Sequence, residues 1–170
     1  AVFILSFPYF NRTFTFSFGK NAEDSFKVMS FNVKNFDLYN WSGKATTRVE
    51  IIKLVREEAP DIACFQEFHD ANKDGKRNFE AITDALEPCY SAFATTYDRN
   101  GSRFGVALFS KFEILDWKPI ALVASKNNTA LWADLLLPED TIRVFNVHLQ
   151  SINLEYDDYD YLEAPNENQD

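Results

Sequence analysis

The alternation of apolar and polar residues along the chain predicts a β-α-β-α order followed by a run of strands. Residues 26–33 (FKVMSFNV) alternate with a period of two, which is typical of a strand with one buried face. Residues 61–68 (DIACFQEF) form a short apolar run with a polar end and are predicted to be the second strand. Between them, apolar residues recur at helical spacing, which predicts a helix that Thr46 or Thr47 caps and that runs to about Glu58.

A second helix and five further strands are expected in the rest of the chain. Residues 78–86 carry a helical pattern that stops before Pro88. Strand candidates then follow in quick succession, with Gly, Asn and Asp at the turns between them. They span residues 89–95, 104–110, 112–119, 129–137 and 141–148. This order favours a mixed sheet with helices on one side over a purely parallel sheet.

The composition is that of a globular domain. The chain has 170 residues, of which 46% are apolar and 25% charged, and it is long enough to bury a core without a disulfide or zinc staple. Disorder of the whole chain, a collagen, a coiled coil and a disulfide scaffold are excluded. Cys64 and Cys89 form no CxxC or metal-ligand pair, so we expect buried thiols rather than a bridge.

The net charge of −9 is unevenly spread. Residues 151–170 hold seven of the 26 acidic residues and no basic one, which leaves 19 acidic against 17 basic residues over 1–150. A nearly neutral body does not favour binding of nucleic acid through a basic face. An enzyme that contacts one or two phosphates remains compatible with this charge.

Both ends of the chain have unusual composition. The first ten residues carry no charge, but a membrane span needs about 20 apolar residues. They are either the end of a transmembrane helix that begins upstream or an apolar strand packed on the domain, and residues 11–25 resemble a connector. At the other end, strand patterning stops near Leu149, and the acidic, Tyr-rich tail is typical of a solvated helix start or loop.

Polar residues interrupt the apolar strands near their carboxyl ends in three places. Asn32 follows the first strand pattern, Gln66 and Glu67 follow the second, and Asn146 and His148 close the last one. Ligands tend to bind at the carboxyl ends of strands in α/β layers. Each residue alone is typical of a local structural group, but the coincidence of three strand ends indicates a site.

These segments resemble the endonuclease/exonuclease/phosphatase superfamily, the metal-dependent phosphoesterase fold of deoxyribonuclease I, abasic-site endonucleases, bacterial sphingomyelinases and inositol-polyphosphate 5-phosphatases. The stretch FDLYNW (36–41), with the apolar N-terminus, further resembles a membrane-anchored bacterial branch in which transmembrane helices precede the phosphoesterase domain. Four motifs match the superfamily in order: VMSFNV (28–33), PDIACFQEF (60–68), RFGVALFSKFEI (103–114) and FNVHLQS (145–151).

The resemblance implies a role for each matching residue. Glu67 would be the principal ligand of a Mg²⁺ or Mn²⁺ ion, and Asn32 would hold that carboxylate or a bound water. His148 would contact the scissile phosphate and stabilise its charge or assist the leaving group. Asn146 would act beside it or only brace the strand. Arg103 would donate to a phosphate oxygen, against the alternative of a surface charge near a turn.

Other residues in the matching motifs are expected to be structural. Gln66 is adjacent to Glu67 on a strand, so its side chain should point to the opposite face. Ser110 and Lys111 are expected to shape a turn, and His69 to be a solvated loop residue. The aromatic loop of Phe36, Tyr39 and Trp41 is compatible with stacking on a base or contact with lipid, but packing on the adjacent helix is favoured.

The chain departs from the family pattern after His148. Neither the G-D-x-N motif nor the terminal S-D-H motif follows, and these supply the residues that orient and deprotonate the attacking water. Residues 26–170 are therefore expected to form an incomplete N-terminal portion of the domain, and residues 1–25 a possible membrane anchor and connector. This portion is the first half of a four-layer α-β-β-α sandwich with mixed, mostly antiparallel sheets, whose inner apolar face would be left bare.

The implied function is metal-dependent hydrolysis of a phosphodiester or phosphomonoester by in-line attack of water, with the 170-residue chain inactive by itself. The implied location is a bacterial cell membrane, to which a segment upstream of the domain would attach it. The sequence does not indicate on which side of the membrane the domain lies. Charge does not favour nucleic acid as the substrate, and a lipid headgroup is an alternative. The competing hypotheses are a non-catalytic, membrane-attached binding module that keeps half of the fold, and an unrelated mixed α/β domain that matches by chance.

Overall fold

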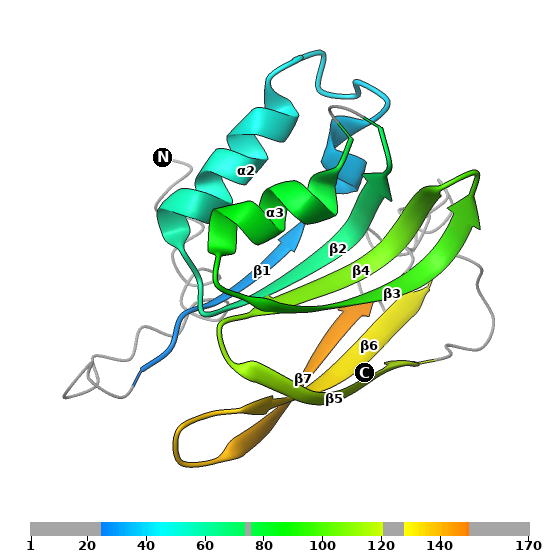
Figure 1. The fold of residues 1–170 in the computed structure, drawn as a ribbon. Helices are drawn as coiled ribbons and strands as arrows, with labels where there is room; N and C mark the ends of the chain where they lie inside the picture. Colours follow the sequence, from blue (N-terminus) through cyan, green and yellow to red (C-terminus); the bar gives the residue numbers. More distant parts are fainter. Residues whose placement is uncertain (1–24, 74–75, 121–127, 150–170) are drawn as a thin grey trace, which may run out of the picture.

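The computed structural model describes residues 25–73, 76–120 and 128–149, which form two β-sheets and one layer of helices (Figure 1). The predictions for the apolar N-terminal segment and for the acidic tail lie outside these residues. Of the helices in the described ranges, none has the length and apolar character needed to cross a membrane. Cys64 and Cys89 are free thiols; Cys64 is buried as predicted, whereas Cys89 is half-buried.

The first sheet, sheet A, has the strand order β1-β2-β4-β3. β1 runs parallel to β2, and the other pairs are antiparallel, so the sheet is mixed as predicted. The β3–β4 hairpin turns at Asn100 and Gly101, which both have positive φ, the conformation that two-residue hairpins prefer. The strands are β1 (Val28–Asn32), β2 (Ile62–Ala71), β3 (Tyr90–Arg99) and β4 (Ser102–Ser110).

The second sheet, sheet B, is antiparallel in the order β5-β6-β7 and packs on the inner face of sheet A. Its strands are β5 (Glu113–Ile120), β6 (Thr129–Leu136) and β7 (Thr141–His148). Leu131, Ala133 and Leu135 of β6 share one buried cluster with Val106 and Leu108 of β4. The expectation of a bare inner face is therefore wrong, because the predicted run of five strands divides between the two sheets.

Two helices cover the outer face of sheet A (Figure 1). They are α2 (Thr47–Glu58) and α3 (Asn78–Leu86), with the bounds that the sequence pattern predicts. α2 buries Ile51 and Val55, and it ends where Ala59 takes a left-handed conformation just before Pro60. The layers described are thus helix, sheet and sheet, which confirms the predicted mixed α/β class.

A cluster of phenylalanines joins the helices to sheet A. The Phe68 ring lies in edge-to-face or tilted contact with Phe36, Phe65, Phe93 and Phe109, at centroid separations of 5.0 to 6.0 Å. Such contacts stabilise a core beyond the area that they bury. Phe65 and Phe68, which flank residues 66 and 67 of β2, are therefore both held in the core. Their packing constrains the backbone that carries Gln66 and Glu67.

Candidate functional site

A β-bulge in β2 sets the direction of the candidate metal ligand. The pairing of β2 with β4 shifts between Phe65 and Phe68, and Glu67 has a φ of 49°. A non-glycine residue in this left-handed region is uncommon and marks a local constraint. Because Phe65 and Phe68 are both fully buried, the bulge turns Glu67 out of the strand alternation without disturbing the core.

Asn32, Glu67 and His148 lie together at one end of the two sheets. The Asn32 Nδ2 donates to Glu67 Oε1 at 2.8 Å, and the backbone N–H of Lys34 donates to Asn32 Oδ1 at 3.0 Å. These two bonds fix the orientation of the amide. The His148 Nε2 lies 3.9 Å from the same Glu67 oxygen, and the side chains of His148 and Glu67 are 22% and 32% exposed. The three side chains therefore converge as expected, with the carboxylate still accessible to solvent. Glu67, however, lies at the bulge inside β2 and not at the end of the strand, because β2 continues to Ala71.

Gln66 and Asn146 form a second pair beside the first. The Gln66 Nε2 donates to Asn146 Oδ1 at 2.8 Å. Gln66 and Glu67 thus both reach side chains of β7, so the prediction that they point to opposite faces is wrong. The physical reason is the bulge, which absorbs one residue between Phe65 and Phe68.

Asn146 braces the two sheets against each other. It is 1% exposed, and its Nδ2 donates to the backbone oxygens of Phe65 at 3.0 Å and of Ala107 at 2.9 Å. His148 is two residues further along β7 and therefore lies on the same face. The position of Asn146 thus fixes how closely His148 approaches Glu67, and its catalytic role stays a prediction.

Arg103 has protein partners on the helix side of sheet A. Its Nη2 forms a 2.7 Å ion pair with Asp70 Oδ2, and its guanidinium lies over the Phe93 ring, 5.0 Å from the centroid. The other Asp70 oxygen accepts the backbone N–H of Phe79 at the start of α3, at 2.9 Å. These contacts place Arg103 under α3, and its contact with a phosphate stays a prediction.

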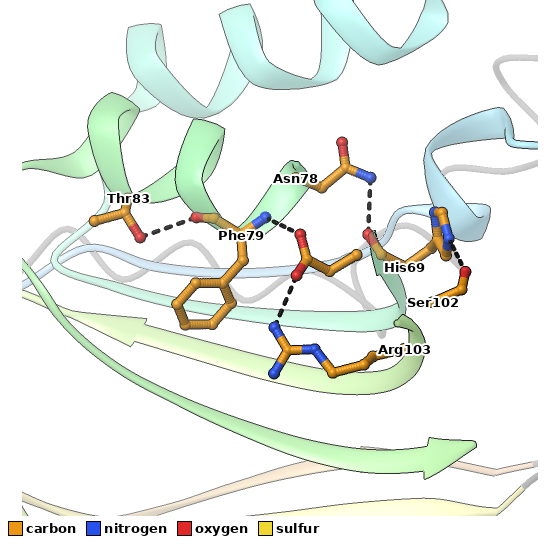
Figure 2. Close-up of polar contacts among 7 residues, drawn as sticks. His69, Asn78, Phe79, Thr83, Ser102 and Arg103 are labelled. Atoms are coloured by element: carbon orange, nitrogen blue, oxygen red, sulfur yellow. Dashed lines mark hydrogen bonds and ion pairs between the residues drawn. The ribbon is translucent and has the colours of Figure 1, made fainter. Parts of the chain in front are cut away.

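A buried polar network at the end of β2 was not predicted from the sequence (Figure 2). The Asn78 Nδ2 donates to the His69 backbone oxygen at 2.7 Å, and Arg48 Nε donates to Asn78 Oδ1 at 2.7 Å. The His69 Nε2 lies 2.8 Å from Ser102 Oγ, and its side chain packs on Phe104. His69 is 1% exposed, so its assignment to a solvated loop is wrong: β2 continues beneath the start of α3.

This burial makes folding stability depend on the protonation of His69. Burial lowers the pKa of His69, the positive charge of Lys76 lowers it further, and the charge of Asp70 opposes the change. As pH falls below the unfolded-state pKa of about 6.5, the unfolded chain takes up the proton first, so stability falls. We expect a lower urea midpoint at pH 5.5 than at pH 7.5, and a smaller difference in His69→Gln. The control is His148→Gln, which replaces the other of the two histidines in the chain. If His148→Gln reduced the pH dependence of the urea midpoint as much as His69→Gln, the assignment to His69 would be contradicted.

The donors at the site fit a hard divalent cation of the Mg²⁺ kind. Such an ion keeps several waters and binds through one or two carboxylates. Glu67 supplies a partly exposed carboxylate that Asn32 orients, while Asn32 Oδ1 is already bonded to the Lys34 backbone. Across residues 25–73, 76–120 and 128–149, no three His, Cys, Asp or Glu side chains form a group that could hold a metal.

Comparison with known families gives one match over most of the chain. Residues 29–168 match the model of the Endonuclease/Exonuclease/phosphatase family. A search of the curated proteins found no match.

Solved structures of this family have a similar fold. An endonuclease/exonuclease/phosphatase from Beutenbergia cavernae has a TM-score of 0.59 at 17% identity, over 76% of this chain and 39% of that one. A family protein from Leptotrichia buccalis has a TM-score of 0.56 at 14% identity, over 85% and 63%. D. rerio TDP2, complexed with single strand DNA product, has a TM-score of 0.58 at 13% identity, over 84% and 57%. The chain thus spans between 39% and 63% of the length of these three structures.

Proposed function

Because the chain belongs to the endonuclease/exonuclease/phosphatase family, we propose that it carries the metal-ligand part of a divalent-metal-dependent phosphoesterase. The observation that carries this proposal is the convergence of Asn32, Glu67 and His148 from three strands. Asn32 and Glu67 lie more than eighty positions before His148 in the sequence. Packing of an apolar core would not by itself require these three polar side chains to meet.

We assign each side chain a role that is compatible with its contacts. Glu67 would hold Mg²⁺ or Mn²⁺, and Asn32 orients its carboxylate through Oε1. His148, which sits on β7 across the site, would donate to an oxygen of the scissile phosphate or to the leaving group. A bound Mg²⁺ or Mn²⁺ ion would supply positive charge beside the phosphate and the leaving oxygen. Asn146 would hold β7 against β2 and β4 through its bonds to the backbone oxygens of Phe65 and Ala107.

We further propose that the groups that activate water come from a part of the protein other than this chain. The support is the absence of G-D-x-N and S-D-H motifs from the sequence, together with the fraction of its structural relatives that the chain spans. The 170-residue chain should then bind metal without turnover. Attachment to a membrane through residues 1–25 and beyond remains part of the proposal, supported by the uncharged start of the chain.

Removal of the metal is the first test of this function. With the longer protein, Mg²⁺ or Mn²⁺ should support hydrolysis of bis-p-nitrophenyl phosphate or p-nitrophenyl phosphate. Excess EDTA should abolish the activity, and added Mg²⁺ should restore it. Under the same assay, residues 1–170 should release no p-nitrophenol. Activity that survives EDTA would overturn the metal mechanism. A longer protein that binds metal but hydrolyses neither compound would support the binding-module alternative instead.

A further inference from the structure

The loop that follows Asn32 presents two large aromatic side chains to solvent. It runs from η2 (Lys34–Asp37) to the start of α2 (Figure 1). Tyr39 is 60% exposed and Trp41 is 61% exposed, and their ring centroids lie 5.0 Å apart. The prediction that these two rings pack on the adjacent helix is therefore wrong, whereas Phe36 of the same loop is buried against Phe68.

The exposure of the rings does not result from a poorly held loop. Residues 34–37 form a left-handed turn with φ between 45° and 57°, a conformation that persists only where surrounding contacts impose it. The Asp37 carboxylate accepts bonds from the backbone N–H and the hydroxyl of Ser42, which lower the pKa of Asp37. Gly43 N–H in turn donates to the Asn40 backbone oxygen at 3.1 Å. The two rings are thus held on a preorganised turn.

The same loop is attached to the residues of the candidate site. Val33 N–H donates to the Gln66 backbone oxygen at 3.0 Å, and Lys34 N–H donates to Asn32 Oδ1. Phe36 packs on Phe68, the residue that follows Glu67. The loop therefore rises from the end of sheet A where Asn32 and Glu67 meet.

The chemistry of the loop indicates what it binds. Phe36 is buried and Leu38 is half-buried, so Tyr39 and Trp41 are the large apolar side chains that this loop exposes. The exposed groups are two flat rings, with Lys34 and Lys44 exposed on the same loop. Flat rings beside cations are the combination that binds a base and its phosphate.

We propose that Tyr39 and Trp41 form an aromatic shelf that stacks on the base of a nucleotide-type phosphoester whose phosphate lies at Asn32, Glu67 and His148. This inference rests on the proposed function and names its substrate class. It requires no basic groove along a polymer, so it is compatible with the nearly neutral body of the chain.

A matched pair of ligands tests the shelf. Adenosine 5′-monophosphate and ribose 5-phosphate carry the same phosphate and sugar and differ by the base. With residues 1–170 and saturating Mg²⁺, calorimetry should show the adenosine compound binding roughly tenfold more tightly. Tyr39→Ala and Trp41→Ala should each remove most of this preference and leave the affinity for ribose 5-phosphate unchanged. Trp41→Phe, which keeps a flat ring, should retain most of it.

The control is Tyr90→Ala. Tyr90 is 48% exposed at the opposite end of sheet A, where it pairs with Ser110, so this change should alter neither affinity. Equal binding of both compounds by the unmodified chain would overturn the shelf. So would Trp41-dependent sedimentation with phosphatidylcholine–phosphatidylglycerol vesicles and no preference for the base. If Glu67→Gln abolishes Mg²⁺-dependent binding of ribose 5-phosphate, the phosphate site stands even when the shelf fails. If neither compound binds, both proposals fail.

Discussion

Replacing Glu67 with Gln is expected to lower metal-dependent turnover of the longer protein by roughly a hundredfold to a thousandfold. Gln keeps an oxygen that can accept the Asn32 hydrogen bond, so the site should keep its shape and lose only the negative charge. Mn²⁺ affinity of the 170-residue chain, followed by electron paramagnetic resonance, should fall with the turnover. Because the change is nearly isosteric, the urea midpoint should stay close to that of the unmodified chain.

Glu113→Gln is the matched control for this experiment. Glu113 is an exposed carboxylate at the start of β5, outside the site, and its replacement removes the same charge. Turnover and Mn²⁺ affinity should both be unchanged. If Glu67→Gln and Glu113→Gln behave alike, Glu67 is not a metal ligand and the proposed function loses its main support.

Gly105→Ala is expected to have the largest effect on folding, about 3 kcal/mol or more of lost stability. An added Cβ at Gly105 would lie 1.9 Å from the Ala94 backbone oxygen and 2.9 Å from the Ala94 carbonyl carbon. These are backbone atoms of the neighbouring strand, so β3 and β4 would have to separate. Gly105 also pairs with Phe68 across the bulge, so the disturbance reaches the strand that carries Glu67. Urea unfolding, followed by circular dichroism, measures the loss.

Gly43→Ala gives the comparison for this prediction. Nothing lies within 4 Å of a Cβ added there, and only the positive φ of 67° opposes alanine. The expected cost is about 1 kcal/mol. A Gly105→Ala variant as stable as Gly43→Ala would show that β3 and β4 separate with little loss of their interaction.

Local periodicity explains how much of the fold the sequence predicts. The pattern of apolar residues predicts the bounds of α2 and α3 and the positions of the seven strands in the described part of the chain. It does so because a buried face repeats every two residues in a strand and every three to four in a helix. It does not say which strands pair. The division of the last five strands into β3–β4 and β5–β7 depends on contacts between distant segments, so the covered inner face could not be predicted.

The site was predictable where polar residues interrupt apolar runs in the sequence. Asn32, Glu67 and His148 interrupt apolar runs, and the structure brings them together. His69 has no such signal, because its burial depends on Asn78 and on Ser102, 33 positions away. The local pattern of apolar and polar residues does not indicate the bulge either. The side chains of Gln66 and Glu67 were therefore wrongly predicted to point to opposite faces of the sheet. The nearest available signal was the unbroken run of polar and aromatic residues from Gln66 to Asp70.

At Glu67, the residue type that the backbone conformation favours differs from the one that the proposed metal site requires. A φ of 49° suits glycine or asparagine better than glutamate, which pays conformational strain of about 1 kcal/mol there. In laboratory evolution for thermal resistance alone, replacements at this position should therefore be enriched. Retention of the acid in natural variants would instead measure how strongly selection acts on activity. The proposed metal ligand is thus among the first residues that a purely stabilising design would discard.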